Sequence, residues 1–264
     1  MKRLVLGMIG LIGVGTTVPA TAADLAARPY TKAPPPVVAA AYDWSGFYIG
    51  LNGGGGWGHK CWTNTSTFGG PTIPNVAEGC HDASGGMVGG QIGYRWQSAS
   101  WVFGVEAQGD WANFTGSNAS LASATVFGFP VTNRTKIDAF GLFTGQVGYT
   151  WNNVLWYVKG GAAVSDDKYN GIFTATGIAF DQATETRWGG VVGTGLEFGF
   201  APNWSVAVEY DHMFMGSRNL SLTALPGAGI PVGALSRVDS IRQDVDMATV
   251  RVNYRWGGAV VAKY

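Results

Sequence analysis

The feature that most constrains this chain is a recurring alternation of apolar and polar residues in segments of about ten or more residues. In one such segment, Trp101, Phe103 and Val105 fall on one face of an extended strand. Glu106 and Gln108 fall on the opposite face. One face suits lipid and the other suits water, but a soluble β-sandwich alternates in the same way, so the pattern alone does not separate the two.

Eight alternating segments follow one another along the chain, and each is long enough to cross a membrane at a tilt. Their approximate bounds are 47–56, 86–96, 101–111, 136–151, 154–164, 186–200, 204–213 and 245–256. Every backbone polar group must be satisfied within a bilayer, so strands can span it only as a closed barrel. The sequence therefore predicts an all-β fold, an eight-stranded antiparallel up-and-down transmembrane β-barrel that occupies residues 44–264.

The connections between these segments alternate between short and long. The short ones, at 97–100, 152–153 and 201–203, have the length of hairpin turns. The other four are polar or glycine-rich and run for about 20 to 30 residues, which a compact soluble domain seldom tolerates. Outer-membrane barrels have short periplasmic turns and long extracellular loops, so we assign the connections in that way.

The three short turns also keep the two faces in register. Polar-face residues should face each other across them in the pairs Gln91 with Glu106, Gln146 with Lys159, and Gly195 with Glu209. Turns of different length that all preserve one polar and one apolar face support a real barrel.

Aromatic residues cluster at both ends of the apolar face. Seven of them flank the short turns, and three lie near the opposite ends of their strands. Aromatic residues at both interfaces are typical of membrane barrels, whereas a soluble core would not gather them at strand ends. The expected aromatic girdle consists of Trp96, Trp101, Trp151, Trp156, Phe200, Trp204, Trp256, Trp57, Trp111 and Trp188.

The first residues indicate export. Lys2 and Arg3 precede an apolar stretch and a small-residue cleavage pattern, so residues 1–22 are expected to form a removable signal peptide. The full chain has 17 basic and 17 acidic residues, and loss of Lys2 and Arg3 leaves it slightly acidic. This balance implies no nucleic-acid partner.

The segment that follows the signal, residues 23–43, is rich in alanine and proline. Such a composition favours an extended chain over a packed core, so we expect a periplasmic tether. A cell-wall contact through Arg28 and Lys32 is the alternative to a simple spacer.

Four motifs carry a resemblance to a known family: Asp43-Trp44-Ser45-Gly46-Phe47-Tyr48-Ile49-Gly50, the stretch from Arg187-Trp188-Gly189 to Glu197, Pro202-Asn203-Trp204-Ser205, and Val250-Arg251-Val252-Asn253-Tyr254-Arg255-Trp256. They resemble the alphaproteobacterial outer-membrane immunogenic proteins, which are small porin-like barrels. The resemblance covers the signal and nearly all of the barrel, and it implies architecture rather than catalysis. Residues 257–264 depart from the pattern, which leaves Trp256 and Tyr264 as alternative terminal signals for the barrel-assembly machinery.

The interior of an eight-stranded barrel is just wide enough for side chains to fill. Inward charges of both signs can offset the cost of removing each other from water, so we favour an ion-pair network over a conduction path. Its expected members are Arg95, Glu106, Lys159, Arg187, Glu197, Glu209, Arg251 and Arg255. Glu209 and Arg251, on neighbouring strands, are the pair expected at its centre.

The two cysteines form the sharpest site-like cluster. Cys61 and Cys80 lie in the first long connection of an exported chain. An oxidising compartment favours a disulfide, and a long loop gains stability from a covalent cross-link. With His59 and His81 they would also suit tetrahedral zinc, which is the alternative. We expect the disulfide and no bound metal or other cofactor.

A hydrolytic site has one weak candidate, His212 beside Asp211 and near Glu209. His212 falls on the lipid face and no serine lies obviously opposite, so we expect no enzymatic activity.

Two function classes remain. One is a structural and antigenic surface protein of the Gram-negative outer membrane. The other is porin-like transport of a small solute, or capture of a ligand such as haem by the loops. The resemblance favours the first, with outer-membrane lipid, lipopolysaccharide and, during insertion, the barrel-assembly machinery as partners.

Overall fold

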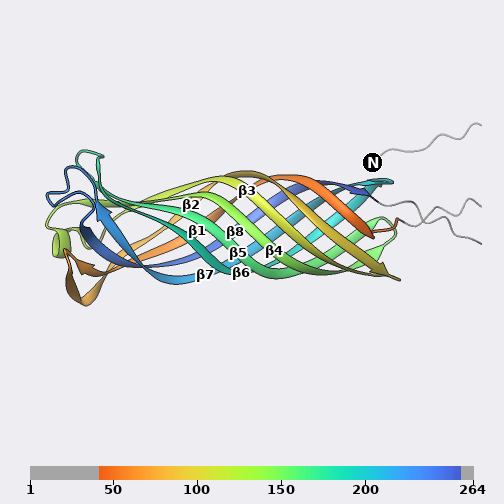
Figure 1. Cartoon of the computed structure of the whole chain (residues 1–264), viewed down its shortest axis with the longest axis horizontal. Helices are drawn as coiled ribbons and strands as arrows, with labels where there is room; N and C mark the ends of the chain where they lie inside the picture. Colours follow the sequence, from red (N-terminus) through yellow and green to blue (C-terminus); the bar gives the residue numbers. More distant parts are fainter. Residues whose placement is uncertain (1–41, 257–264) are drawn as a thin grey trace, which may run out of the picture. The chain divides into compact units, whose positions relative to one another are not determined.

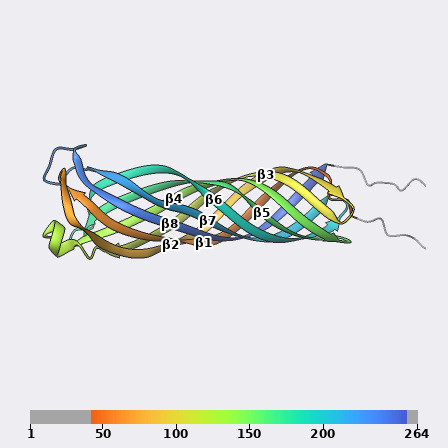
Figure 2. The same ribbon diagram turned by 90° about the horizontal axis from the view of Figure 1, so that it is seen from below.

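Eight antiparallel strands wind around one axis as tilted ribbons in the computed structural model, which describes residues 42–256 (Figures 1 and 2). The signal peptide, most of the tether and Tyr264 lie outside the described residues. None of the helical structure in the described part of the chain is long and apolar enough to cross a membrane.

Each strand pairs with the next one in the sequence, and the last pairs with the first. Phe47 lies opposite Trp256 at one end of this closing seam, and Thr67 lies opposite Arg237 at the other. The predicted up-and-down barrel is therefore confirmed. The strands are β1 (Gly46–Thr67), β2 (Gly70–Ser98), β3 (Trp101–Ala119), β4 (Val131–Trp151), β5 (Val154–Phe173), β6 (Ala179–Ala201), β7 (Trp204–Ala224) and β8 (Leu235–Trp256).

The strands are much longer than the sequence pattern predicted. The shortest, β3, has 19 residues and the longest, β2, has 29, whereas about 9–11 residues suffice to cross a membrane. The prediction of four loops of about 20 to 30 residues is wrong, because most of those residues continue the strands. The connections at that end are confined to 68–69, 120–130, 174–178 and 225–234.

The aromatic girdle shows where the membrane lies on the outside of the barrel. All ten predicted girdle residues face outward, with exposed fractions from 44% for Trp204 to 76% for Trp111. Along β3, Trp101 and Trp111 are separated by about 25 Å parallel to the axis, given about 3.3 Å per residue and a tilt near 40°. That distance matches the height of the apolar band of a membrane barrel. The strands therefore extend beyond this band at the end of the barrel opposite residues 42 and 256.

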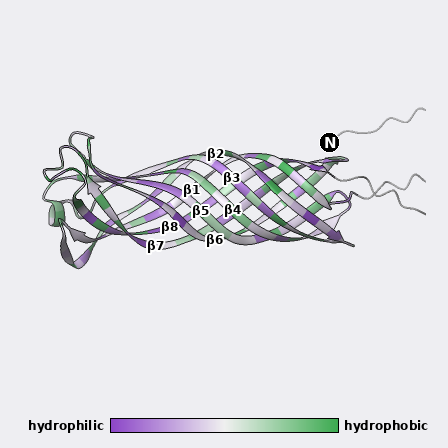
Figure 3. Cartoon of the chain, viewed as in Figure 1, coloured by the Kyte–Doolittle hydropathy of each residue, from purple (hydrophilic) through white to green (hydrophobic). Residues whose placement is uncertain are grey.

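The register keeps one face of every strand toward the interior, and hydropathy alternates along the ribbons (Figure 3). Gln146 lies opposite Lys159 as predicted, and Gly195 lies opposite Glu209 as predicted. The predicted pairing of Gln91 with Glu106 is wrong, because Gln91 lies opposite Gln108. The turn there has two residues rather than four, and this even shift leaves every side chain on its predicted face.

The extended strands predict which positions a membrane-impermeant maleimide can reach in intact cells. A cysteine in place of Ser117, an exposed residue above the girdle on β3, should be labelled quickly. A cysteine in place of Val105, on the same strand and face but between the aromatic belts, should stay unlabelled because lipid covers it. Labelling of Ser117→Cys only after the envelope is broken would reverse the assigned orientation of the barrel.

Candidate functional site in the barrel lumen

The inward side chains of β8 show how the interior is layered. From the end with the short turns outward, the strand contributes Arg251, then Met247, then Ile241 and finally Arg237, all of them buried. Charged and apolar levels therefore alternate along the axis of the barrel. A soluble core would place its apolar residues together, whereas this interior interleaves them with ion pairs.

The lower charged layer lies within the membrane-spanning part and contains Arg95, Glu106, Lys159, Glu197, Glu209, Asp211 and Arg251, all of them buried. The Arg251 guanidinium lies 2.7 Å from Glu106 and forms a second ion pair with Glu209. The Lys159 ammonium lies 2.5 Å from Glu209 and 3.3 Å from Asp211. Each charge thus has an opposite partner, which offsets the cost of holding it away from water.

Two tyrosines complete this layer from opposite sides. The Tyr48 hydroxyl donates a hydrogen bond of 2.6 Å to Glu106, and its ring lies over Gly93 on the neighbouring strand. A Cβ atom at Gly93 would come within 2.4 Å of the Tyr48 hydroxyl, so only glycine leaves room for the ring. Tyr157 and Gly195 repeat the arrangement, with the hydroxyl donating to Glu209.

The eight residues predicted to form the lumen network divide into three groups. Six of them belong to the lower charged layer. Arg187 lies higher in the barrel, where it pairs with Glu185 at 2.8 Å and donates to the Ile241 carbonyl oxygen. Arg255 lies at the rim near the short turns and donates to the carbonyl oxygens of Ser45 and Pro202. Those two arginines therefore do not join the network, and Asp211, which the prediction omitted, does.

A methionine-rich layer fills the lumen above the lower charged layer. Its buried members include Met87, Phe114, Phe140, Met213, Met215 and Met247. Methionine side chains are flexible and polarizable, so they fill irregular space between rigid neighbours. This level blocks the axis with apolar atoms.

The next level contains a buried ion pair outside the membrane-spanning part. The Lys60 ammonium lies 2.6 Å from Asp167, and both side chains are fully buried. Burial lowers the pKa of Lys60 to about 8, although the Asp167 carboxylate opposes that shift. Above this pair, the Trp62 and Tyr169 rings pack edge to face at 5.5 Å.

The upper charged layer gathers three carboxyl groups around one guanidinium. Arg237 lies 2.8 Å from Glu78, 3.0 Å from Asp181 and 3.3 Å from Asp239. Burial raises the pKa of Asp239 well above its usual range, and the neighbouring Glu78 carboxylate adds to the effect while Arg237 opposes it. The direction of this shift favours the protonated form of Asp239 more than in an exposed aspartate.

An aromatic cap closes the outer end of the lumen. The connection between β3 and β4 contains the short helix η1 (Ser123–Phe127), and Phe127 and Phe129 pack with Phe173 and Phe180. The ring of Phe127 lies 5.2 Å from the Arg237 guanidinium, so the cap rests directly on the upper charged layer.

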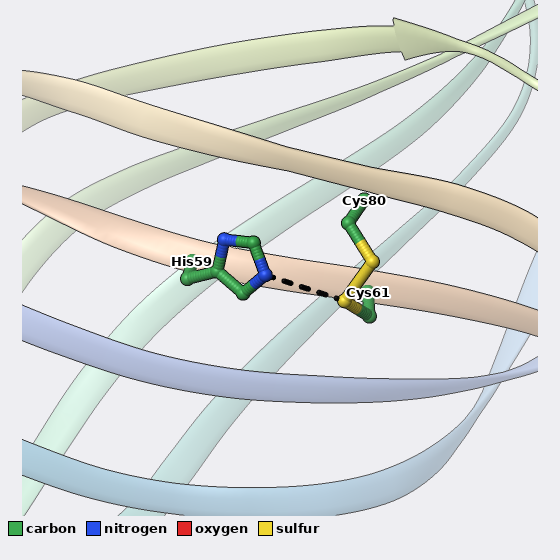
Figure 4. A group of neighbouring side chains, drawn as sticks. All are labelled: His59, Cys61 and Cys80. Atoms are coloured by element: carbon green, nitrogen blue, oxygen red, sulfur yellow. Dashed lines mark hydrogen bonds between the residues drawn. A yellow bond between two sulfur atoms is a disulfide. The ribbon is translucent and has the colours of Figure 1, made fainter.

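The two cysteines lie on strands rather than in a loop. Cys61 on β1 is directly opposite Cys80 on β2, and a disulfide joins them on the outer face of the barrel (Figure 4). The loop placement was wrong because β1 and β2 continue through this region. With both sulfurs joined, neither is a thiolate ligand, and His81 points inward to Asn118 at 2.7 Å. The geometry therefore does not support the zinc alternative.

The residues of the weak hydrolytic alternative also separate. His212 faces outward, where its Nδ1 atom lies 2.6 Å from Asp246. Asp211 faces inward and contacts Lys159. Neighbouring residues of one strand point to opposite faces, so these two groups share no site.

Comparison with known proteins places this barrel among outer-membrane proteins. The family model described as outer membrane protein beta-barrel domain matches residues 17–256. The chain is 30% identical to the 31 kDa outer-membrane immunogenic protein of Brucella melitensis biotype 1, covering 83% of this chain and 90% of that protein. It is also 30% identical to the 25 kDa outer-membrane immunogenic protein of Brucella abortus biovar 1, covering 84% and 88%.

The solved structure of the outer membrane protein OprG from Pseudomonas aeruginosa has a similar fold. It aligns with a TM-score of 0.53 and 13% sequence identity, covering 82% of this chain and 99% of that one. At this identity the similarity concerns the fold alone.

The lower charged layer leads to a test of stability. Replacing Arg251 with Met should destabilise the barrel by about 3–5 kcal/mol, because Glu106 and Glu209 both lose their guanidinium partner in a buried setting. Urea unfolding in lipid vesicles, followed by tryptophan fluorescence, measures the change. Arg242→Met, at an outward position of the same strand, is the matched control and should change stability by about 0.5 kcal/mol or less.

Adding Glu209→Gln to Arg251→Met should recover part of the loss, because it removes one of the three carboxylates that are left around the Lys159 ammonium alone. If the Arg251→Met barrel were as stable as the Arg242→Met barrel, the ion pairs of this layer would contribute nothing measurable.

The raised pKa of Asp239 leads to a second test. Because the shift favours the protonated carboxyl group, which an amide replaces closely, Asp239→Asn should change unfolding stability by about 1 kcal/mol or less, whereas Arg237→Met should cost several times more. The heat-dependent shift in gel mobility that folded membrane barrels show can rank the two variants. Equal losses for both would mean that Asp239 is ionised and paired with Arg237.

Proposed function

The chain belongs to the outer membrane protein β-barrel domain family, and on that premise we propose that it is a structural, surface-exposed component of the outer membrane without enzymatic activity. The observation that supports this proposal is the filled lumen. Buried charged and apolar side chains occupy each layer from the lower charged layer to the aromatic cap. An outer-membrane barrel that offers no wide passage contributes mainly through its surfaces.

The filled lumen argues against porin-like transport as the main role. A hydrated solute would have to displace the Arg251 pairs, the methionine-rich layer and the Arg237 cluster in turn. Each step would leave buried charges unpaired or apolar side chains without contacts, and both are costly. Ligand capture by long flexible loops is also less favoured, since most of the predicted loop residues belong to strands.

The part of the barrel above the girdle supports a role at the cell surface. Its strands expose polar side chains in fixed positions, such as Ser217, Arg218 and Asn219 on β7. Rigid, solvent-exposed surface is well suited to recognition by antibodies, and the Brucella relatives are called immunogenic. We extend that surface role to this chain.

The outer face also supports a contact with lipopolysaccharide. Lys136 and Lys168 lie opposite each other on β4 and β5 and both contact Asp138 at 2.6 Å. They sit above the girdle, at the level proposed for the lipid headgroups. Arg134 adds a third cation and Asp166 a second carboxylate on the same outer face, so positive charge remains in excess. We assign anionic lipid phosphates to this pair and insertion of the barrel to the barrel-assembly machinery.

Planar bilayer recording tests the proposed absence of a transport role. The purified full-length protein should give no stable, reproducible conductance steps, because ion pairs and apolar layers occupy the lumen. A wide porin reconstituted in parallel controls for successful insertion. Reproducible steps from this protein at matched insertion would overturn the structural assignment and favour small-solute transport.

A further inference from the structure

Six side chains form an array on the outer face of the barrel, just above the girdle residue Trp57. They come from three neighbouring strands, and the register sets them in two rows. The first row is Cys80 on β2, Cys61 on β1 and Arg242 on β8, and the second row is Asp82, His59 and Asp244 on the same strands.

His59 connects the second row to the disulfide. Its Nδ1 atom lies 2.7 Å from the Asp82 carboxylate, and its Nε2 atom lies 3.5 Å from the sulfur of Cys61 (Figure 4). Both partners are hydrogen-bond acceptors, so a doubly protonated imidazole can donate to both at once. The His59 and Asp82 side chains are 56% and 61% exposed, so solvent and solutes reach them.

The surroundings of the two sulfurs differ. Cys61 is half-buried and lies beside the His59 imidazole. The register places it opposite Arg242, whose side chain is 70% exposed and pairs with Asp244 at 3.3 Å. Neighbouring histidine and arginine stabilise a thiolate. Asp82 and Asp244 flank His59 on either side. Cys80 is the exposed member of the pair, so an incoming molecule reaches it first.

We propose that the Cys61–Cys80 disulfide is a thiol–disulfide exchange site for low-molecular-weight thiols outside the cell, with Cys80 as the attacked sulfur and Cys61 as the leaving sulfur. The thiolate of the incoming molecule forms a new bond to the Cys80 sulfur. The electron pair of the broken S–S bond passes to Cys61, whose thiolate then accepts the proton of the His59 Nε2 or stays paired with it. A second thiolate releases Cys80, so two thiols are oxidised to one disulfide while the protein disulfide is reduced.

The barrel does not depend on the disulfide at this level. Pairing of β1 with β2 continues beyond the cysteines to Thr67 and Gly70. On the inner face, Lys60 pairs with Asp167 and Trp62 packs on Tyr169. Opening of the outer S–S bond therefore leaves the interior contacts in place, which a reversible exchange site requires.

The direction of exchange can be tested on the unmodified protein. The full-length barrel in detergent is exposed briefly to reduced glutathione, quenched with acid, alkylated and mapped by peptide mass spectrometry. Glutathione should be found on Cys80 and the alkylated thiol on Cys61, because the His59 imidazole beside Cys61 can stabilise the departing thiolate. An equal distribution over the two cysteines would overturn the proposal.

Variants test the assigned roles, with folding checked by gel mobility. His59→Gln should slow disulfide opening by about tenfold, and Arg242→Gln should slow it by a smaller factor. Asp82 is a positioning residue, so Asp82→Asn should slow opening and Asp82→Glu should restore most of the rate. Arg134→Gln, which removes an exposed charge on β4, is the matched control and should behave as the unmodified protein. If His59→Gln opened at the unmodified rate, the disulfide would be a structural link only.

Discussion

Closure of β1 against β8 is the constraint on which the rest of the structure depends. The seam runs from Phe47 opposite Trp256 to Thr67 opposite Arg237, so it continues well beyond the thickness of a membrane. Without this seam, two rows of backbone amides and carbonyls would face lipid without partners, at a cost of several kcal/mol for each group. Once the ring is closed, each strand has one face toward lipid and one toward a narrow interior, and the sequence must meet both demands residue by residue.

Those demands explain how much of the fold could be predicted. Between the aromatic belts the outward face must be apolar, so residues such as Val250 and Val252 alternate with Arg251 and Asn253, and all eight strands were found there. Above the belts the outward face meets water. Along β8, Arg242 and Ser240 face outward while Gln243 and Asp239 face inward, so hydropathy no longer alternates although the strand continues. The alternation of hydropathy ends where lipid no longer contacts the outward face. The sequence pattern therefore predicts loops for these strand residues.

The same boundary divides the predicted and unpredicted parts of the lumen. The six predicted members of the lower charged layer lie inside the membrane, where an inward charge stands out against apolar neighbours. Lys60, Glu78, Asp181 and Arg237 carry equally buried ion pairs but lie among polar residues, and nothing local separated them from a solvated loop. Continued pairing of long strands was the missing information, because it decides which of two adjacent polar residues is enclosed.

The alternation of inward and outward side chains also separates the polar groups near the two cysteines. His59 and Cys61 face outward while Lys60 between them faces inward, and on β2 Cys80 faces outward while His81 faces inward. The alternative zinc site would have needed His59, His81 and both cysteines together, whereas the strands divide the two histidines between a sealed interior and an exposed surface. The outward groups gain neighbours that are distant in the sequence, among them Arg242 and Asp244 on β8, while the His59 imidazole contacts the sulfur of Cys61. The composition of this outward surface therefore follows from the closed seam, because only the pairing of β1 with β8 brings Arg242 opposite Cys61.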